Sequence, residues 1–141
     1  MQVDLATVRG FFAASPFVAD LGLEVLEAAP GRIVAGLAVV PRHTQHTGVV
    51  HAGVLTTLAD HAMGAAAQTL APDGLWVLTA ELKISLLRGA RAERLWCAAS
   101  VLKPGRRLSF TEAEVWAEAG GERRLVVKAS ATMALTEVDA G

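Results

Sequence analysis

The spacing of apolar residues changes several times along this chain, and each change predicts a new element. In residues 4–14 the apolar side chains recur at helical spacing behind Asp4, a favourable N-cap, and Pro16 is expected to end this helix. Residues 22–29 and 32–40 are rich in Val, Leu and Ala, and a Pro-Gly pair separates them. We therefore predict two strands joined by a turn.

The middle of the chain follows a different pattern. Residues 41–48 hold a proline and a glycine and are expected to form a loop. Residues 51–70 show no strand alternation, contain no proline and have enough Ala and Leu for a helix of about five turns, which Pro72 ends. Alternation then returns, and short turn-forming segments separate four predicted strands: 75–87, 94–103, 107–119 and 122–135.

The order of these elements limits the fold. The central helix is apolar on nearly all sides, so it can be buried only if a sheet curls around it. The last four strands have connections too short for parallel crossovers, which makes the sheet antiparallel. We predict an α+β protein with the hotdog fold, in which an antiparallel sheet of five to six strands wraps a long central helix. A chain of 141 residues suits one such domain, spanning residues 1–141.

Composition adds an expectation of self-association. Hydrophobic residues make up 52% of the chain, charged residues 19%, and the mean hydropathy is +0.40. Such a chain has more apolar surface than one monomer easily buries, so a homodimer or homotetramer is expected. No apolar run reaches the roughly 18 residues of a membrane span, and the amino end does not resemble a signal peptide.

Charge and cysteine content limit the expected partners and the expected cellular location. The net charge is −1, and the 13 Lys and Arg residues form no long basic stripe. Neither nucleic acid nor a membrane is therefore an expected partner. The single cysteine, Cys97, cannot form a disulfide within the chain, which fits a cytoplasmic protein.

One carboxylate, Asp60, lies in the middle of the predicted apolar helix. A carboxylate in a low-dielectric environment is costly unless it is hydrogen-bonded, paired or protonated. The simplest interpretation is that the Asp60 side chain points to water or forms a hydrogen bond with a neighbouring His or Thr. The residues that share its side of the helix are small or polar: Gly53, Thr56, Gly64 and Ala67. The opposite side is apolar: Leu55, Leu58, Ala59, Ala62 and Ala66. Small neighbours let a ligand or another chain approach the acid.

The start of the same helix offers a second chemical feature. Backbone N–H groups in the first turn have no partner within a helix, and the helix dipole makes that end positive. A helix start of this kind stabilises an oxyanion. Asp60 lies about two turns after this helix start. The carboxylate and the helix start together form a candidate catalytic site.

Residues 43–60, HTQHTGVVHAGVLTTLAD, resemble the signature of phenylacetic-acid-degradation-type (PaaI-like) hotdog acyl-CoA thioesterases. In that signature an Asn-x-x-Gly-x-x-His-Gly-Gly run leads to an Asp in the central helix. The similarity continues through LTAELKISLLRGA (78–90) and KPGRRLSFTEAEV (103–115), and covers about residues 30–135. Two positions depart from it. Gln45 replaces Asn with a longer amide, and Ala52 replaces Gly but keeps its backbone N–H.

The resemblance implies a role for each matching residue. Asp60 would act as nucleophile or general base against a thioester carbonyl, and the site would lie between two subunits. No cofactor is expected. The other matching residues divide into side chains that orient the thioester or water, Gln45, His51 and Thr79, and backbone groups that hold the oxyanion, at Ala52 and Gly53.

Two basic turns are expected to bind coenzyme A. The resemblance places both along the pantetheine and nucleotide path, where cations would contact phosphates. The first turn contributes Arg88, Gly89 and Arg91, and the second contributes Lys103, Gly105, Arg106 and Arg107. Surface turns carry Lys and Arg routinely, so these residues count as evidence only as a group.

Other interpretations stay open at this point. Four histidines, His43, His46, His51 and His61, could bind a metal with Asp60, but their spacing matches no recognised site, and no metal is expected. A hotdog hydratase or dehydratase would also accept acyl thioesters. A non-catalytic acyl-CoA-binding domain is the third possibility, since a fold can outlive its chemistry. The acyl group itself is expected to be an aryl or medium-chain group.

Overall fold

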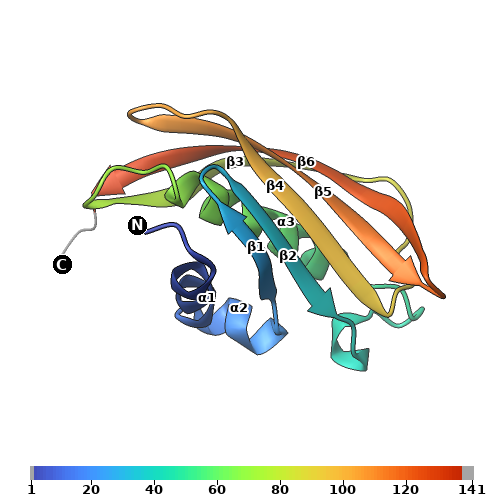
Figure 1. Ribbon diagram of the computed structural model, residues 1–141. Helices are drawn as coiled ribbons and strands as arrows, with labels where there is room; N and C mark the ends of the chain where they lie inside the picture. The colour runs from blue at the N-terminus through green and yellow to red at the C-terminus, as the bar shows by residue number, and fades with distance from the viewer. Residues whose placement is uncertain (1, 138–141) are drawn as a thin grey trace.

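The computed structural model describes residues 2–137, and its main feature is an antiparallel sheet that curls around one long helix (Figure 1). The strand order is β1-β2-β4-β5-β6-β3, so β1 and β3 form the two edges. The strands are β1 (Glu24–Ala29), β2 (Arg32–Ala38), β3 (Leu75–Leu86), β4 (Arg94–Lys103), β5 (Leu108–Ala119) and β6 (Glu122–Glu137). All strand ends lie within two residues of the predicted ones, and the predicted hotdog arrangement is confirmed.

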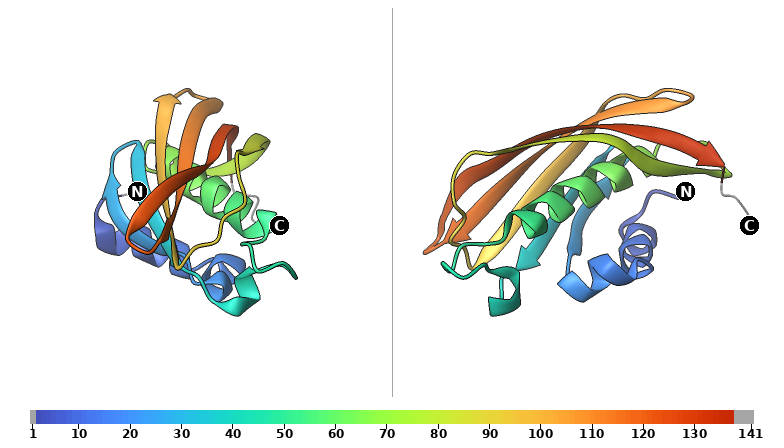
Figure 2. Two further views of the ribbon diagram at one scale, coloured as in Figure 1. Left: turned by 90° about the vertical axis from the view of Figure 1, so that its right-hand side faces the viewer. Right: turned by 180° about the vertical axis from the view of Figure 1, so that it is seen from behind.

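The central helix, α3 (Ala52–Gln68), lies in the concave face of the sheet, as the view from behind shows (Figure 2). Its predicted apolar side is buried, with exposed fractions between 0% and 3% for Leu55, Leu58, Ala59, Ala62 and Ala66. The alanines let the helix approach β4 and β5 closely. Ala67, which helical spacing places on the side of Asp60, is also buried, with 2% of its surface exposed.

Both edges of the sheet are partly covered by side chains. At the β3 edge, Gln68 Nε2 donates to the Leu75 carbonyl and Gln68 Oε1 accepts from the Val77 N–H, each at 3.0 Å. At the β1 edge, Arg9 Nε donates to the Val25 carbonyl at 3.3 Å. The β1–β2 ladder also shifts register between Val25 and Glu27. Each edge therefore has backbone groups that are already hydrogen-bonded.

Two short helices precede the sheet. The first, α1 (Leu5–Ala13), begins as predicted at Asp4, whose Oδ1 accepts from the Thr7 N–H at 2.8 Å. The second, α2 (Pro16–Leu21), was not predicted, because Pro16 was treated only as a helix stop. Proline also suits the first position of a helix, where its missing N–H costs nothing. None of the helices within residues 2–137 is both long and apolar enough to span a membrane.

Candidate active site

Asp60 of α3 and Thr79 of β3 meet at a short hydrogen bond. Thr79 Oγ1 donates to Asp60 Oδ1 at 2.6 Å. The Asp60 side chain is half-buried, and its second carboxylate oxygen accepts no hydrogen bond from residues 2–137. One oxygen is thus anchored to the edge strand, while the other remains available for chemistry.

A β-bulge positions Thr79. In the β3–β6 ladder, Thr79 lies opposite Met133 while Glu81 lies opposite Thr132, so Ala80 is an extra residue in β3. A bulge of this kind re-aims the neighbouring side chains. The Thr79 hydroxyl also lies 3.5 Å from Met133 Sδ, which holds it between the sheet and the acid.

The start of α3 is organised by His51. Its Nδ1 accepts from the Gly53 N–H at 2.8 Å, so the ring proton sits on the exposed Nε2. A Cβ at Gly53 would lie 3.0 Å from His51 Nδ1, which explains the glycine. The two backbone groups expected at the oxyanion site therefore differ. The Gly53 N–H is already engaged, whereas the Ala52 N–H makes no hydrogen bond among residues 2–137.

Gln45 belongs to a tight loop that leads into this helix. Its N–H donates to the Val49 carbonyl and its carbonyl accepts from the Gly48 N–H, both at 2.9 Å. Gly48 has a φ of 86°, a left-handed conformation that glycine adopts without strain. The Gln45 side chain makes no hydrogen bond within the described part of the chain. Its amide is therefore free to meet a ligand.

The candidate residues form two groups within one chain. Asp60 contacts Thr79, while His51 and the Ala52 N–H lie at the start of the helix. From position 52 to position 60, α3 rises about 12 Å, at 1.5 Å per residue. Oxyanion donors act at about 3 Å, so the acid and the Ala52 N–H of one chain cannot serve the same carbonyl.

A cavity of about 190 Å³ opens beside Asp60. Its other lining residues come from three elements: Phe11 of α1, His61, Gly64 and Ala65 of α3, and Val77, Leu78 and Thr79 of β3. The Phe11 and His61 rings stack with centroids 5.6 Å apart. The sequence gives helical spacing that connects Asp60 with Gly64, but it has no signal that brings Phe11 here, because that contact is tertiary.

His61 is a wall of this cavity. Burial lowers its pKa from the ordinary value of 6.5, although the neighbouring Asp60 charge acts in the opposite direction. Its Nε2 is shielded from solvent and has no hydrogen-bond partner among residues 2–137. The Phe12 ring packs edge-on against it, with centroids 4.4 Å apart. His61 is therefore a neutral, ring-stacked side chain near pH 7, and not a cation paired with Asp60.

His43 and Cys97 are both buried. His43 Nδ1 accepts from the Val40 N–H at 3.0 Å, and His43 Nε2 donates to the Leu21 carbonyl at 2.8 Å. Within residues 2–137, no three His, Cys, Asp or Glu side chains are grouped so that they could hold a metal ion. Burial in β4 raises the pKa of the Cys97 thiol to about 12.

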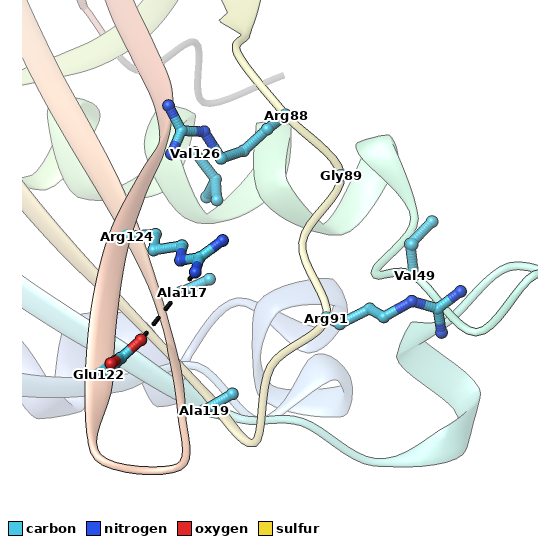
Figure 3. A pocket seen from close by; sticks show the side chains of 9 residues that line it. All are labelled: Val49, Arg88, Gly89, Arg91, Ala117, Ala119, Glu122, Arg124 and Val126. Carbon is cyan, nitrogen blue, oxygen red and sulfur yellow. Dashed lines mark ion pairs between the residues drawn. The ribbon is translucent and has the colours of Figure 1, made fainter.

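The first basic turn lines a cavity of about 500 Å³, shown in Figure 3. Arg88, Gly89 and Arg91 share this cavity with Arg124 of β6, which the sequence analysis missed. Arg91 Nη2 donates to the Thr47 carbonyl at 2.8 Å, and this bond fixes the loop next to Gly48. Arg124 forms a loose ion pair with Glu122, with nitrogen and oxygen 4.0 Å apart.

The second basic turn lies at the opposite end of the sheet. Lys103, Arg106 and Arg107 are exposed beside the β4–β5 hairpin, whereas the first turn precedes the other end of β4 (Figure 1). A strand of ten residues spans about 30 Å. A Cβ at Gly105 would run into the Leu108 carbonyl, so the hairpin itself requires that glycine. One chain does not bring the two basic turns together.

Comparison with known proteins identifies the family. A model of the thioesterase superfamily matches residues 47–123. The chain belongs to the thioesterase superfamily. A crystal structure of a thioesterase family protein from Silicibacter pomeroyi is 35% identical, has a TM-score of 0.91 and is matched over 96% of this chain and 100% of that chain. The zebra fish thioesterase superfamily member 2 is 31% identical, with a TM-score of 0.82 and coverage of 94% and 98%.

A curated human protein, acyl-coenzyme A thioesterase 13, is also similar to this thioesterase. It is 27% identical over 117 residues, which cover 82% of this chain and 83% of the human protein. The predicted family of hotdog-fold thioesterases is confirmed. The family match includes Asp60, Thr79 and both basic turns, whereas Phe11 and Gln45 lie before it. The α1 wall of the Asp60 cavity is thus outside the matched segment.

Proposed function

We propose that this thioesterase hydrolyses an acyl-CoA to the free acid and CoA, with Asp60 as the catalytic carboxylate. The Thr79–Asp60 hydrogen bond carries this proposal, because it anchors one oxygen and leaves the other beside a cavity. As a nucleophile, the free oxygen attacks the carbonyl carbon, the C–S bond breaks, CoA leaves as the thiol after taking a proton, and water cleaves the anhydride. As a general base, Asp60 instead takes a proton from the attacking water.

We further propose that two chains build each site. The separation of about 12 Å between Asp60 and Ala52 along α3 supports this proposal, because a second chain could bring its own Ala52 N–H to the carbonyl that Asp60 attacks. The edge strand β3 offers the joining surface, since its exposed side chains include Trp76 at 49%, Leu78 at 60% and Leu86 at 49%. Pairing two β3 edges would cover these side chains and place Asp60 opposite the partner's Gln45 loop, in a dimer or a doubled tetramer.

The same dimer would reunite the two basic turns. A two-fold axis makes paired β3 strands antiparallel, so the end of one sheet that holds Arg88 adjoins the partner's end that holds Lys103. The separation of the turns within one chain therefore supports a nucleotide site assembled from two chains. We assign Arg88, Arg91 and Arg124 to one half of that site, and Lys103, Arg106 and Arg107 to the other.

The acyl group is proposed to be an aryl or medium-chain group. The cavity beside Asp60 is about 190 Å³ in one chain, and its walls include the apolar side chains of Phe11, Val77 and Leu78. A cavity of this size suits one ring or a short chain better than a long lipid chain, because pockets for drug-sized ligands start at about 300 Å³.

The single thiol, which is free and buried, supports the cytoplasmic location expected from the sequence.

The decisive experiment measures thiol release from a panel of acyl-CoAs by the parent and by Asp60→Asn. We expect turnover by the parent and a loss on the order of 10²-fold or more in the variant, with an unchanged circular dichroism spectrum. Turnover of the variant within about twofold of the parent would contradict the role of Asp60. Enoyl-CoA hydration without thiol release would instead indicate a hydratase, and acyl-CoA binding without either reaction a non-catalytic domain.

A further inference from the structure

Gly64 lies one helical turn after Asp60 and lines the same cavity. Residues four positions apart share one side of a helix, and Gly64 therefore lies about 6 Å along the axis from the acid. Glycine inside a helix is destabilising by roughly 0.5–1 kcal/mol relative to alanine. Its presence here needs a physical reason.

The backbone does not provide that reason. Gly64 is not among the glycines with positive φ, so an alanine could adopt its conformation. Packing within the chain does not provide it either. An added Cβ at Gly64 would meet no heavy atom within 4 Å among the described residues, whereas at Gly53 it would meet the His51 ring at 3.0 Å. What the glycine preserves is the open space above it.

That space lies where the acyl group of a bound substrate would extend. Under the proposed function, the carbonyl carbon sits against the Asp60 carboxylate, so the acyl group must continue into the cavity. Phe11 and His61 form one stacked wall, and Val77 and Leu78 form another. Gly64 lines this cavity one helical turn after the acid, and a side chain there would project into the space that its hydrogen leaves open.

We propose that Gly64 is a specificity-determining residue that sets the size of the acyl group this thioesterase accepts. The inference rests on the proposed function and extends it to a residue that takes no part in bond breaking. A Cβ at position 64 would enter open space, and larger side chains there would project further into the cavity. Each substitution also removes the helical glycine, so Gly64→Ala stabilises α3.

The test compares Gly64→Ala, Gly64→Val and Gly64→Leu with the parent. The kcat/KM values are measured by thiol release for acetyl-, butanoyl-, hexanoyl-, decanoyl- and benzoyl-CoA. We expect the ratio of kcat/KM for the parent's best substrate to that for acetyl-CoA to fall at each step, by about tenfold or more in Gly64→Leu. Urea unfolding should show that Gly64→Ala is at least as stable as the parent, so that this variant reports on specificity even if Gly64→Leu folds poorly.

Gly10 of α1 provides a matched control. It also lies inside a helix, and a Cβ added there would meet no heavy atom within 4 Å, but it does not line the Asp60 cavity. Gly10→Ala, Gly10→Val and Gly10→Leu change the same helix propensity and should leave the substrate ratios of the parent unchanged.

Three results would overturn the inference. An equal fall for every acyl group, or unchanged ratios in all three Gly64 variants, would show that the cavity above Gly64 does not hold the acyl group. Loss of the parent's oligomeric state in Gly64→Leu, measured by light scattering, would show that a partner chain fills this space. A parent that hydrolyses no acyl-CoA would overturn the proposed function as well, whereas a hydrolysing parent with unmoved ratios overturns only the role of Gly64.

Discussion

Thr79 Oγ1 lies 2.6 Å from Asp60 Oδ1, so the edge strand and the central helix are joined at the candidate catalytic carboxylate. This distance is within the range of strong O–H···O hydrogen bonds to carboxylates. The bulge at Ala80 directs the Thr79 hydroxyl toward the helix, and Met133 Sδ contacts the same hydroxyl. The orientation of the acid therefore depends on the local geometry of β3.

Thr79→Val should impair turnover because it keeps the shape of the side chain and removes the donor. A hydrogen bond to a charged group contributes about 1.5–3 kcal/mol, so we expect kcat/KM to fall by about 10-fold to 100-fold. Thr79→Ser keeps the hydroxyl and should retain most activity. Both are measured by thiol release on the same acyl-CoA. A valine variant within twofold of the parent would show that the hydroxyl does not orient the acid.

Hybrid dimers test whether each site is shared. Asp60→Asn chains are mixed with chains that carry Gln45→Ala and His51→Ala, after both variants are shown to be inactive alone. A hybrid contains one site with two intact halves, so part of the parent activity should return. Hybrid formation is confirmed by native mass spectrometry. Confirmed hybrids without activity would place the whole site within one chain.

The two groups of arginines should act on the nucleotide of CoA. One double variant combines Arg88→Ala and Arg124→Ala, and a second combines Arg106→Ala and Arg107→Ala. Each should raise KM for acyl-CoA by tenfold or more, because each lost charge-assisted contact with a phosphate is worth roughly 1.5–3 kcal/mol. The matching acyl-pantetheine, which lacks the nucleotide, is the control substrate. Equal effects on both substrates would mean that these side chains do not bind the nucleotide.

His61 should make folding stability depend on pH. Burial lowers its pKa below 6.5, so in the window below pH 6.5 the unfolded chain binds a proton that the folded protein excludes. The free energy of unfolding should therefore fall as the pH decreases through this window, and level off below the lowered pKa. Urea unfolding between pH 5 and about pH 8 measures this for the parent and for His61→Phe, which keeps a ring against Phe11.

The His61→Phe variant should lose that part of the pH dependence. His46→Gln, which removes a histidine from an exposed loop, is the control for general loss of a titrating side chain. If the parent and His61→Phe have the same slope across the window, His61 is not excluded from protonation by burial.

The sequence predicted the fold well because two periods dominate it. The helical period of 51–70 and the alternation after residue 75 reflect burial on one side of an element, and burial is what fixes a hotdog architecture. The helix α2 was not predicted because a proline occurs both just after the end of a helix and at the first position of one, and the sequence alone does not distinguish the two.

The candidate site was less visible in the sequence. Asp60 and Thr79 could be proposed from a resemblance, and the structure places them in contact. Phe11 and Arg124 join their cavities only through tertiary folding, so no local pattern marks them. The hydrogen bond from the Gly53 N–H to an imidazole, which separates the two expected oxyanion donors, depends on a side-chain rotamer that spacing does not encode.

The side chains that cover the sheet edges have a consequence for how far assembly can proceed. The Gln68 amide is hydrogen-bonded to the backbone of Leu75 and Val77. A strand from another molecule can therefore pair only with the part of the β3 edge that follows Val77. The β1 edge is short, has a register shift, and has its Val25 carbonyl taken by Arg9. Two molecules that join through β3 thus leave no long flat edge for a third strand, and growth into an open-ended fibre stops at a closed particle.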